Sequence, residues 1–180
     1  MKKNEVFSVK KIIYFSISLL IYGVFSSQSY GANLCRGNEA TIGCLMEHAK
    51  ELYSTNNQLF WDILNKASKR AQDCKSRSDV TRFMKIIRIK RDGVFEEYFH
   101  EKMENLCVSN TKCFFNALIS MTSDDQNKII DLLLTPLFVD QSNITEAFHK
   151  IEGNKKYKRI VDRYQKKLGE KKDLTGNKEK

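Results

Sequence analysis

Three basic side chains at a spacing of three residues, Arg82, Lys85 and Arg88, are the most promising group for chemistry in this sequence. On a helix, this spacing places them along one side, where they can face the same ligand. Arginine offers a planar fork that matches two phosphate oxygens, and lysine offers a compact positive charge. Together with Lys69 and Arg70 on the preceding predicted helix, they predict a site for an anionic ligand such as a phosphomonoester.

The charges of the chain are concentrated in segments. Residues 66–91 hold ten basic and two acidic residues, and residues 154–180 hold eleven basic and four acidic residues. An acidic stretch, residues 92–104, directly follows the first basic segment. The competing interpretation is that these charges form ordinary solvated surface, or that the basic and acidic stretches pair with each other. The second basic segment adds four candidate contacts to an anionic ligand, which are Lys158, Arg159, Arg163 and Lys166.

The first 32 residues have the features of a secretory signal peptide. An N-terminal region with four lysines, residues 1–11, precedes a 14-residue apolar stretch, residues 12–25. Small residues follow at Ser29, Gly31 and Ala32. This order predicts export and cleavage near residue 32. An uncleaved N-terminal anchor is the alternative, although the apolar stretch is short for a bilayer span.

Removal of the signal peptide would leave about 148 residues, which is the size of one domain with a substantial core. We therefore expect a single helical domain at residues 33–169, followed by a flexible basic tail at residues 170–180. After export the protein is expected in the periplasm or outside the cell.

All five cysteines follow the predicted cleavage site and would meet an oxidising compartment, where disulfides persist. Two disulfides and one free thiol are the simplest outcome, and five cysteines allow fifteen such arrangements. The preferred pairing joins Cys44 to Cys74, between the first two predicted helices, and Cys107 to Cys113, across a short turn. No Cys-x-x-Cys spacing is present, so a zinc site is not predicted.

Two Glu-x-x-His sequences could each present a carboxylate and an imidazole on one side of a helix: Glu97 with His100, and Glu146 with His149. Two such pairs, with a carboxylate from each of two further helices, resemble the metal site of ferritin-like di-metal carboxylate proteins. The resemblance implies a metal-binding helical bundle. The interpretation that we favour is an ordinary Glu/His pair on the surface of each helix. The carboxylates available to complete a metal site are Glu47, Glu51 and Asp131.

The sequence contains no Gly-x-Ser-x-Gly, His-Glu-x-x-His or Walker-type motif, so we expect a non-enzymatic protein without a cofactor. Among anionic partners, phospholipid or phosphoinositide headgroups are favoured over nucleic acid, because the chain is expected to be exported and has no nucleic-acid-binding motif. A secreted effector would fit this description. The other open interpretation is a periplasmic protein–protein interaction or chaperone-like module.

Helices must position these side chains, because one proline and eight glycines are too few turn-forming residues for a many-stranded fold. Apolar residues recur at spacings of three and four. The predicted fold class is all-α, a compact bundle of about seven or eight short helices cross-linked by disulfides. Ser78 and Asp79 are expected to cap the third helix, Gly93 to end it, and Gly169 to end the last. The predicted helices cover residues 39–53, 59–77, 80–91, 94–106, 114–121, 123–135, 143–151 and 157–168.

Overall fold

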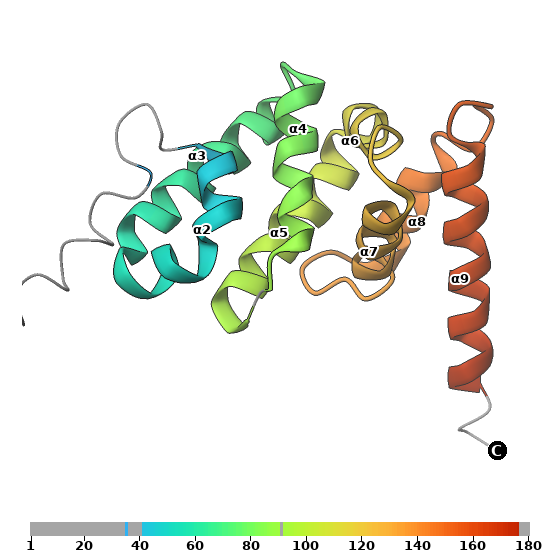
Figure 1. Cartoon of the computed structure of the whole chain (residues 1–180). Helices are drawn as coiled ribbons and strands as arrows, with labels where there is room; N and C mark the ends of the chain where they lie inside the picture. Colours follow the sequence, from blue (N-terminus) through green and yellow to red (C-terminus); the bar gives the residue numbers. More distant parts are fainter. Residues whose placement is uncertain (1–34, 36–40, 91, 177–180) are drawn as a thin grey trace, which may run out of the picture. The chain divides into compact units, whose positions relative to one another are not determined.

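The computed structural model describes residues 35, 41–90 and 92–176, and it confirms the all-α fold (Figure 1). Every regular element within these described residues is a helix. The predicted signal peptide, residues 1–32, lies outside them. The helices are α2 (Ile42–Thr55), α3 (Asn57–Asp73), α4 (Arg77–Met84), the 3-10 helix η3 (Lys85–Arg88), α5 (Gly93–Ser109), α6 (Thr111–Leu118), α7 (Ser123–Leu133), α8 (Gln141–His149) and α9 (Lys158–Gly176).

The chain divides into two units, residues 1–63 and residues 64–180, and the boundary lies within α3. Unit 1 contains α2 and the first part of α3. Unit 2 contains the rest of α3 and all helices from α4 to α9. The single domain expected at residues 33–169 stays a prediction.

In unit 1, the apolar side of α2 follows the predicted helical spacing. Leu45, Ala49 and Leu52 are buried at intervals of four and three residues. The ring of Tyr53 meets the ring of Phe60 on α3 edge to face, with centroids 4.9 Å apart. Because both helices supply apolar side chains at this spacing, the two pack against each other.

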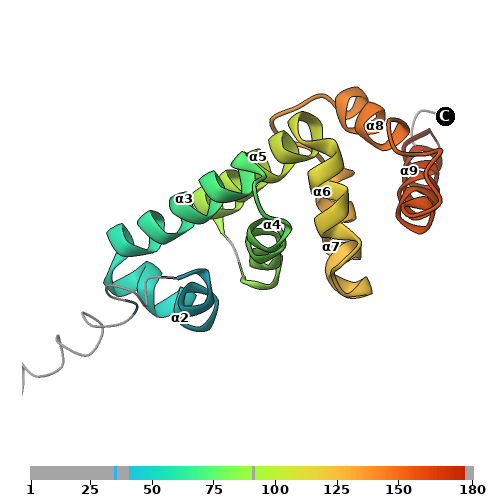
Figure 2. The ribbon, with the colours of Figure 1, turned by 90° about the horizontal axis from the view of Figure 1, so that it is seen from above.

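In unit 2, buried aromatic rings join helices that are distant in the sequence. Phe83 of α4 packs against Phe99 of α5, with centroids 5.6 Å apart. Phe148 of α8 contacts Phe115 of α6 at 4.8 Å and stacks on Tyr164 of α9 at 3.7 Å. Figure 2 shows α9 lying beside α8, as this stacking requires. The core of unit 2 therefore includes the final, basic helix.

The start of α4 differs from the prediction because another serine caps it. The hydroxyl of Ser76 accepts a hydrogen bond from the N–H of Ser78 at 3.2 Å, so Ser76 takes the role expected of Ser78 and Asp79. The helix accordingly begins at Arg77. At Lys85 the backbone tightens into the 3-10 helix, which ends the α-helix before the predicted residue 91.

Two glycines that were expected to end helices do not do so. Gly93 begins α5 and has a φ of +38°, which glycine adopts without strain. Gly169 lies inside α9, which continues to Gly176, so the start of the predicted tail at residues 170–180 is helical. Glycine inside a helix costs only about 1 kcal/mol relative to alanine, so a helix that already packs on the core can continue through it.

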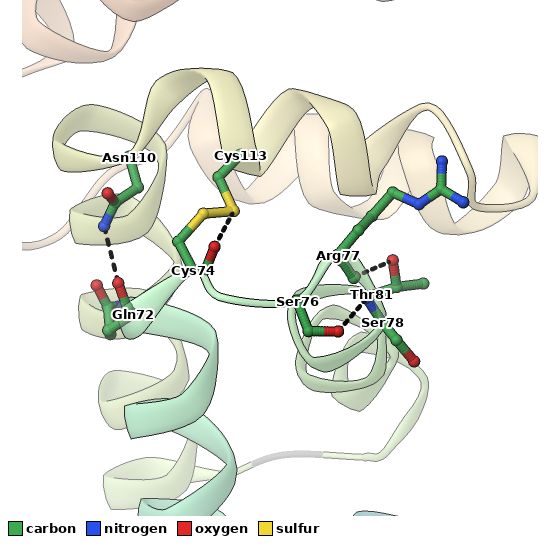
Figure 3. The surroundings of a disulfide bond; sticks show 8 residues. All are labelled: Gln72, Cys74, Ser76, Arg77, Ser78, Thr81, Asn110 and Cys113. Atoms are coloured by element: carbon green, nitrogen blue, oxygen red, sulfur yellow. Dashed lines mark hydrogen bonds between the residues drawn. A yellow bond between two sulfur atoms is a disulfide. The ribbon is translucent and has the colours of Figure 1, made fainter.

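Two disulfides form, and both predicted pairings are wrong. Cys35 pairs with Cys44 and Cys74 with Cys113, with Cα atoms 5.7 and 6.3 Å apart. Cys107, which is fully buried in α5, is free because its predicted partner Cys113 is bonded to Cys74, just past the end of α3 (Figure 3). Cys44 is unavailable to Cys74 because Cys35, nine residues away, is its partner.

The disulfides bear on the compartment of the protein. Two disulfides in one chain are typical of an oxidising, non-cytoplasmic compartment. Among the helices that the structure describes, none combines the length and the apolar character needed to cross a bilayer.

Candidate functional site

Four of the five anion-binding residues predicted on α3, α4 and η3 have no partner within the described part of the chain. Lys69 and Arg70 on α3 and Arg82 on α4 are exposed, and Lys85 at the start of η3 is half-buried. No hydrogen bond or ion pair with a described residue engages any of these four side chains. Arg82 and Lys85 are three residues apart, so they share one side of α4 and its 3-10 extension. These cations are available to an external anion.

Arg88, the third member of the predicted group, is already bound within the protein. Its Nε and Nη2 atoms donate to the two carboxylate oxygens of Asp125 on α7, at 2.9 and 2.5 Å. This carboxylate is 2% exposed and also accepts a hydrogen bond from Thr122 at 2.8 Å. The hydrogen bond from Arg88 holds the pKa of Asp125 below its ordinary value. Arg88 therefore joins η3 to α7 instead of extending the group of Arg82 and Lys85.

The acidic stretch, residues 92–104, forms no ion pair with the basic side chains of the described residues 66–90. Glu101 pairs with Lys102 at 2.9 Å, and Glu96 and Glu104 both face His100. Among the described residues 66–90, Arg88 alone forms an ion pair, and the other basic side chains keep their charge exposed to solvent or partly so. These are Lys66, Lys69, Arg70, Lys75, Arg77, Arg82, Lys85 and Lys90.

The four predicted contacts on α9 differ in whether each side chain already has a partner within the protein. Lys158 pairs with Asp162 at 2.7 Å and Lys166 approaches Glu170 at 3.8 Å. Both pairs are exposed helix-surface pairs, which contribute only about 0.3 to 0.5 kcal/mol and can be exchanged for an external anion. The remaining two residues differ from each other: Arg163 donates to the buried Gln126 of α7 at 3.3 Å, whereas Arg159 is exposed and has no partner among the described residues.

A hollow of about 510 Å³ beside the Cys74–Cys113 disulfide is lined by two cations that were not among the predicted site residues, Arg77 and Lys112. Arg77 is the first residue of α4, and Figure 3 shows it following the chain segment that leaves Cys74. Both side chains are exposed. Sequence spacing could not indicate this grouping, because a disulfide between distant helices brings the two residues to one hollow.

Neither Glu-x-x-His sequence forms the expected pair. His100 lies between Glu96 and Glu104, with nitrogen–oxygen distances of 3.2 and 3.1 Å, and Glu97 points to solvent. In α8, His149 pairs with Glu152 at 2.8 Å, and Glu146 pairs instead with Lys150. The described residues contain no group of three or more His, Cys, Asp or Glu side chains that could hold a metal ion.

Sequence reasoning missed Glu104 as an internal anion site. Its carboxylate is fully buried and accepts hydrogen bonds from the backbone N–H groups of Leu137, Phe138 and Val139, at 2.9, 2.8 and 3.1 Å. Burial alone would raise the pKa of Glu104, but the hydrogen bonds with His100 and these N–H groups outweigh it and lower the pKa. The available signal was its position between the buried Met103 and Leu106 on the apolar side of α5.

No protein-family model, no curated protein and no solved structure matches the chain. The functional argument therefore rests on the charges and contacts of this protein alone.

Proposed function

We propose that this chain is an exported, non-enzymatic helical protein that binds anionic membrane surfaces through phospholipid or phosphoinositide headgroups. The observation that carries the proposal is the charge of residues 66–90, where eight described basic side chains have no ion-pair partner. The acidic side chains of residues 92–104 form no ion pair with these eight cations, so the eight charges can meet an external anion.

The number of cations is sufficient for useful affinity. Each lysine or arginine near an anionic bilayer contributes about 1 kcal/mol. If half of the eight contact the bilayer at once, the electrostatic attraction is about 4 kcal/mol, which corresponds to roughly a thousand-fold enrichment at the surface. Binding of this kind is peripheral and reversible, and it needs no deep pocket.

Two further features support the proposal. The disulfides suit an oxidising compartment, as expected if the N-terminal segment directs export. The basic helix α9 packs on the core through Tyr164 and also carries Arg159 and loosely paired lysines at its surface. Headgroup phosphates can therefore find cations on more than one helix of unit 2.

The test is vesicle co-sedimentation of a triple variant, Arg70→Gln, Arg82→Gln and Lys85→Gln, made in protein purified after export with both disulfides formed. Loss of three contacts should weaken partitioning to vesicles that contain phosphatidylserine by about 100-fold. Fold is not expected to change, because none of the three side chains has a partner among the described residues.

The matched control removes the same charge elsewhere, with Lys50→Gln, Lys128→Gln and Lys150→Gln. All three lysines are exposed, and two of them lie in surface pairs with Asp124 and Glu146. We expect less than about a three-fold loss of binding for this control. Equal losses for the two variants would contradict a site in residues 66–90 and leave only net charge as the cause.

A further inference from the structure

The loop between α7 and α8 exposes two adjacent apolar side chains. Leu137 is 58% exposed and Phe138 is 50% exposed. Single exposed apolar residues are ordinary on protein surfaces, and Val94 is one here. Two large ones side by side in the middle of a loop are a different feature, because the loop presents them together to solvent.

The backbone of this loop is held from inside the protein. Glu104 accepts the N–H groups of both Leu137 and Phe138, so their backbone faces the core while their side chains are exposed. Burying a carboxylate costs several kcal/mol unless hydrogen bonds compensate for lost water. A buried charge therefore holds the backbone of the segment that, among the described residues, exposes two adjacent large apolar side chains.

Both ends of the loop are fixed as well. Gln141 at the start of α8 donates to the carbonyl of Leu133 at 3.2 Å and to the hydroxyl of Tyr164 at 2.9 Å. Lys171 of α9 donates to the carbonyl of Leu134 at 2.5 Å. The two apolar side chains are thus presented by a rigid loop, and ordering them on binding costs little entropy.

The loop lies beside the basic helix α9. Asp140, Leu137 and Phe138 share a cleft of about 600 Å³ with Lys171. It belongs to α9, whose residues 158–176 include seven basic and three acidic residues. Apolar side chains beside lysines match the chemistry of a bilayer interface, where acyl chains lie next to anionic headgroups.

We propose that Leu137 and Phe138 insert into the acyl region of an anionic bilayer while lysines of α9 contact the headgroups. This inference rests on the proposed membrane-binding function and identifies the part of the protein that enters the lipid. Electrostatic attraction brings the protein to the surface, and burial of the two apolar side chains adds to the affinity.

A tryptophan reporter tests the insertion directly. The chain has one tryptophan, Trp61. Combining Trp61→Phe with Phe138→Trp leaves a single reporter at the loop. On binding vesicles of phosphatidylcholine and phosphatidylserine, its emission should shift to the blue and be quenched by brominated acyl chains. In the control, Trp61→Phe with Val94→Trp, the reporter lies just past the basic segment, where contact with headgroups needs no insertion, so brominated acyl chains should not quench its emission.

Co-sedimentation of a second variant, Leu137→Ala with Phe138→Ala, measures the contribution of the loop. We expect about 30-fold weaker binding with an unchanged thermal midpoint, since both side chains are already largely exposed. Vesicle binding with no blue shift and no quenching would overturn insertion of the loop but not membrane binding itself. The same result is expected if the loop instead docks on a protein. Absence of binding to anionic vesicles by the unmodified chain would overturn both proposals.

Discussion

At the scale of single residues, Glu104 shows how a buried charge can serve structure. Its carboxylate replaces water with three backbone N–H groups and His100, so its charge is compensated on several sides. The loop at residues 134–140 has little regular structure of its own, and this one side chain accepts three of its backbone N–H groups.

Glu104→Gln should lower the free energy of unfolding by about 2 to 3 kcal/mol, because an amide cannot accept all of the hydrogen bonds made by the carboxylate. Urea denaturation at neutral pH measures this. Glu97→Gln is the control, since Glu97 is an exposed glutamate on the same helix without a partner among the described residues, and it should change stability by less than about 0.5 kcal/mol.

The same substitution has an expected pH dependence. The pKa of Glu104 in the folded protein lies below its ordinary value of 4.5, so its contribution is complete above that pH and is lost as pH falls through the lowered pKa. The difference in stability between the unmodified protein and Glu104→Gln should therefore shrink as the pH falls below 4.5. A difference that grows in acid would contradict the assignment of a charged, stabilised carboxylate.

The thiol of Cys107 is expected to be inert in the folded protein. It is fully buried, and this burial raises its pKa well above the ordinary value, so little thiolate forms. Labelling with a maleimide should give no adduct on the native protein and one adduct after denaturation without reductant. Three adducts after such denaturation would show that one of the disulfides, Cys35–Cys44 or Cys74–Cys113, had not formed.

At the scale of helices, two arginines six residues apart have different roles. Arg88 binds Asp125 in a two-point ion pair, whereas Arg82 has no partner among the described residues. Because the carboxylate of Asp125 is 2% exposed, removing Arg88 leaves it without its main compensation. The side chain of Arg88 is 43% exposed, which reduces the expected cost of this loss.

Arg88→Gln should therefore destabilise the protein by about 1 to 2 kcal/mol, measured by urea denaturation. Arg82→Gln should leave stability within about 0.5 kcal/mol of the unmodified protein and weaken binding to anionic vesicles. If Arg82→Gln were the more destabilising of the two, Arg82 would have an internal partner and could not be a free ligand contact.

Helical periodicity in the sequence was enough to predict the helices, because Leu45, Ala49 and Leu52 repeat at the spacing that buries one side. It could not predict which side chains pair between helices. Arg88 and Arg82 look alike in the sequence, and what separates them is Asp125, 37 residues beyond Arg88. Cys113 likewise meets Cys74 across 39 residues.

The candidate anion-binding site stays a prediction. Lys69, Arg70, Arg82 and Lys85 have no partner among the described residues, and surface cations of this kind can be named from the sequence because they need no tertiary partner. The loop on Glu104 depends on contacts between residues about 33 positions apart, so no local pattern marks it.

At the scale of the whole molecule, the proposed membrane binding depends on how charge is distributed along the chain. The chain carries 31 basic and 22 acidic residues, and the described basic side chains of residues 66–90 remain almost entirely unpaired within the described structure. The other basic helix, α9, lies next to a loop with two exposed apolar side chains. These features together support the proposal of binding at a membrane surface.

The most direct test of this account is the partition coefficient of the exported, disulfide-bonded protein on vesicles of increasing phosphatidylserine content at physiological salt. We predict negligible partitioning on pure phosphatidylcholine and a rise of about 100-fold by roughly 30% phosphatidylserine, since each engaged cation adds about 1 kcal/mol. Partitioning that is absent at every composition, or equal on neutral and anionic vesicles, would contradict it.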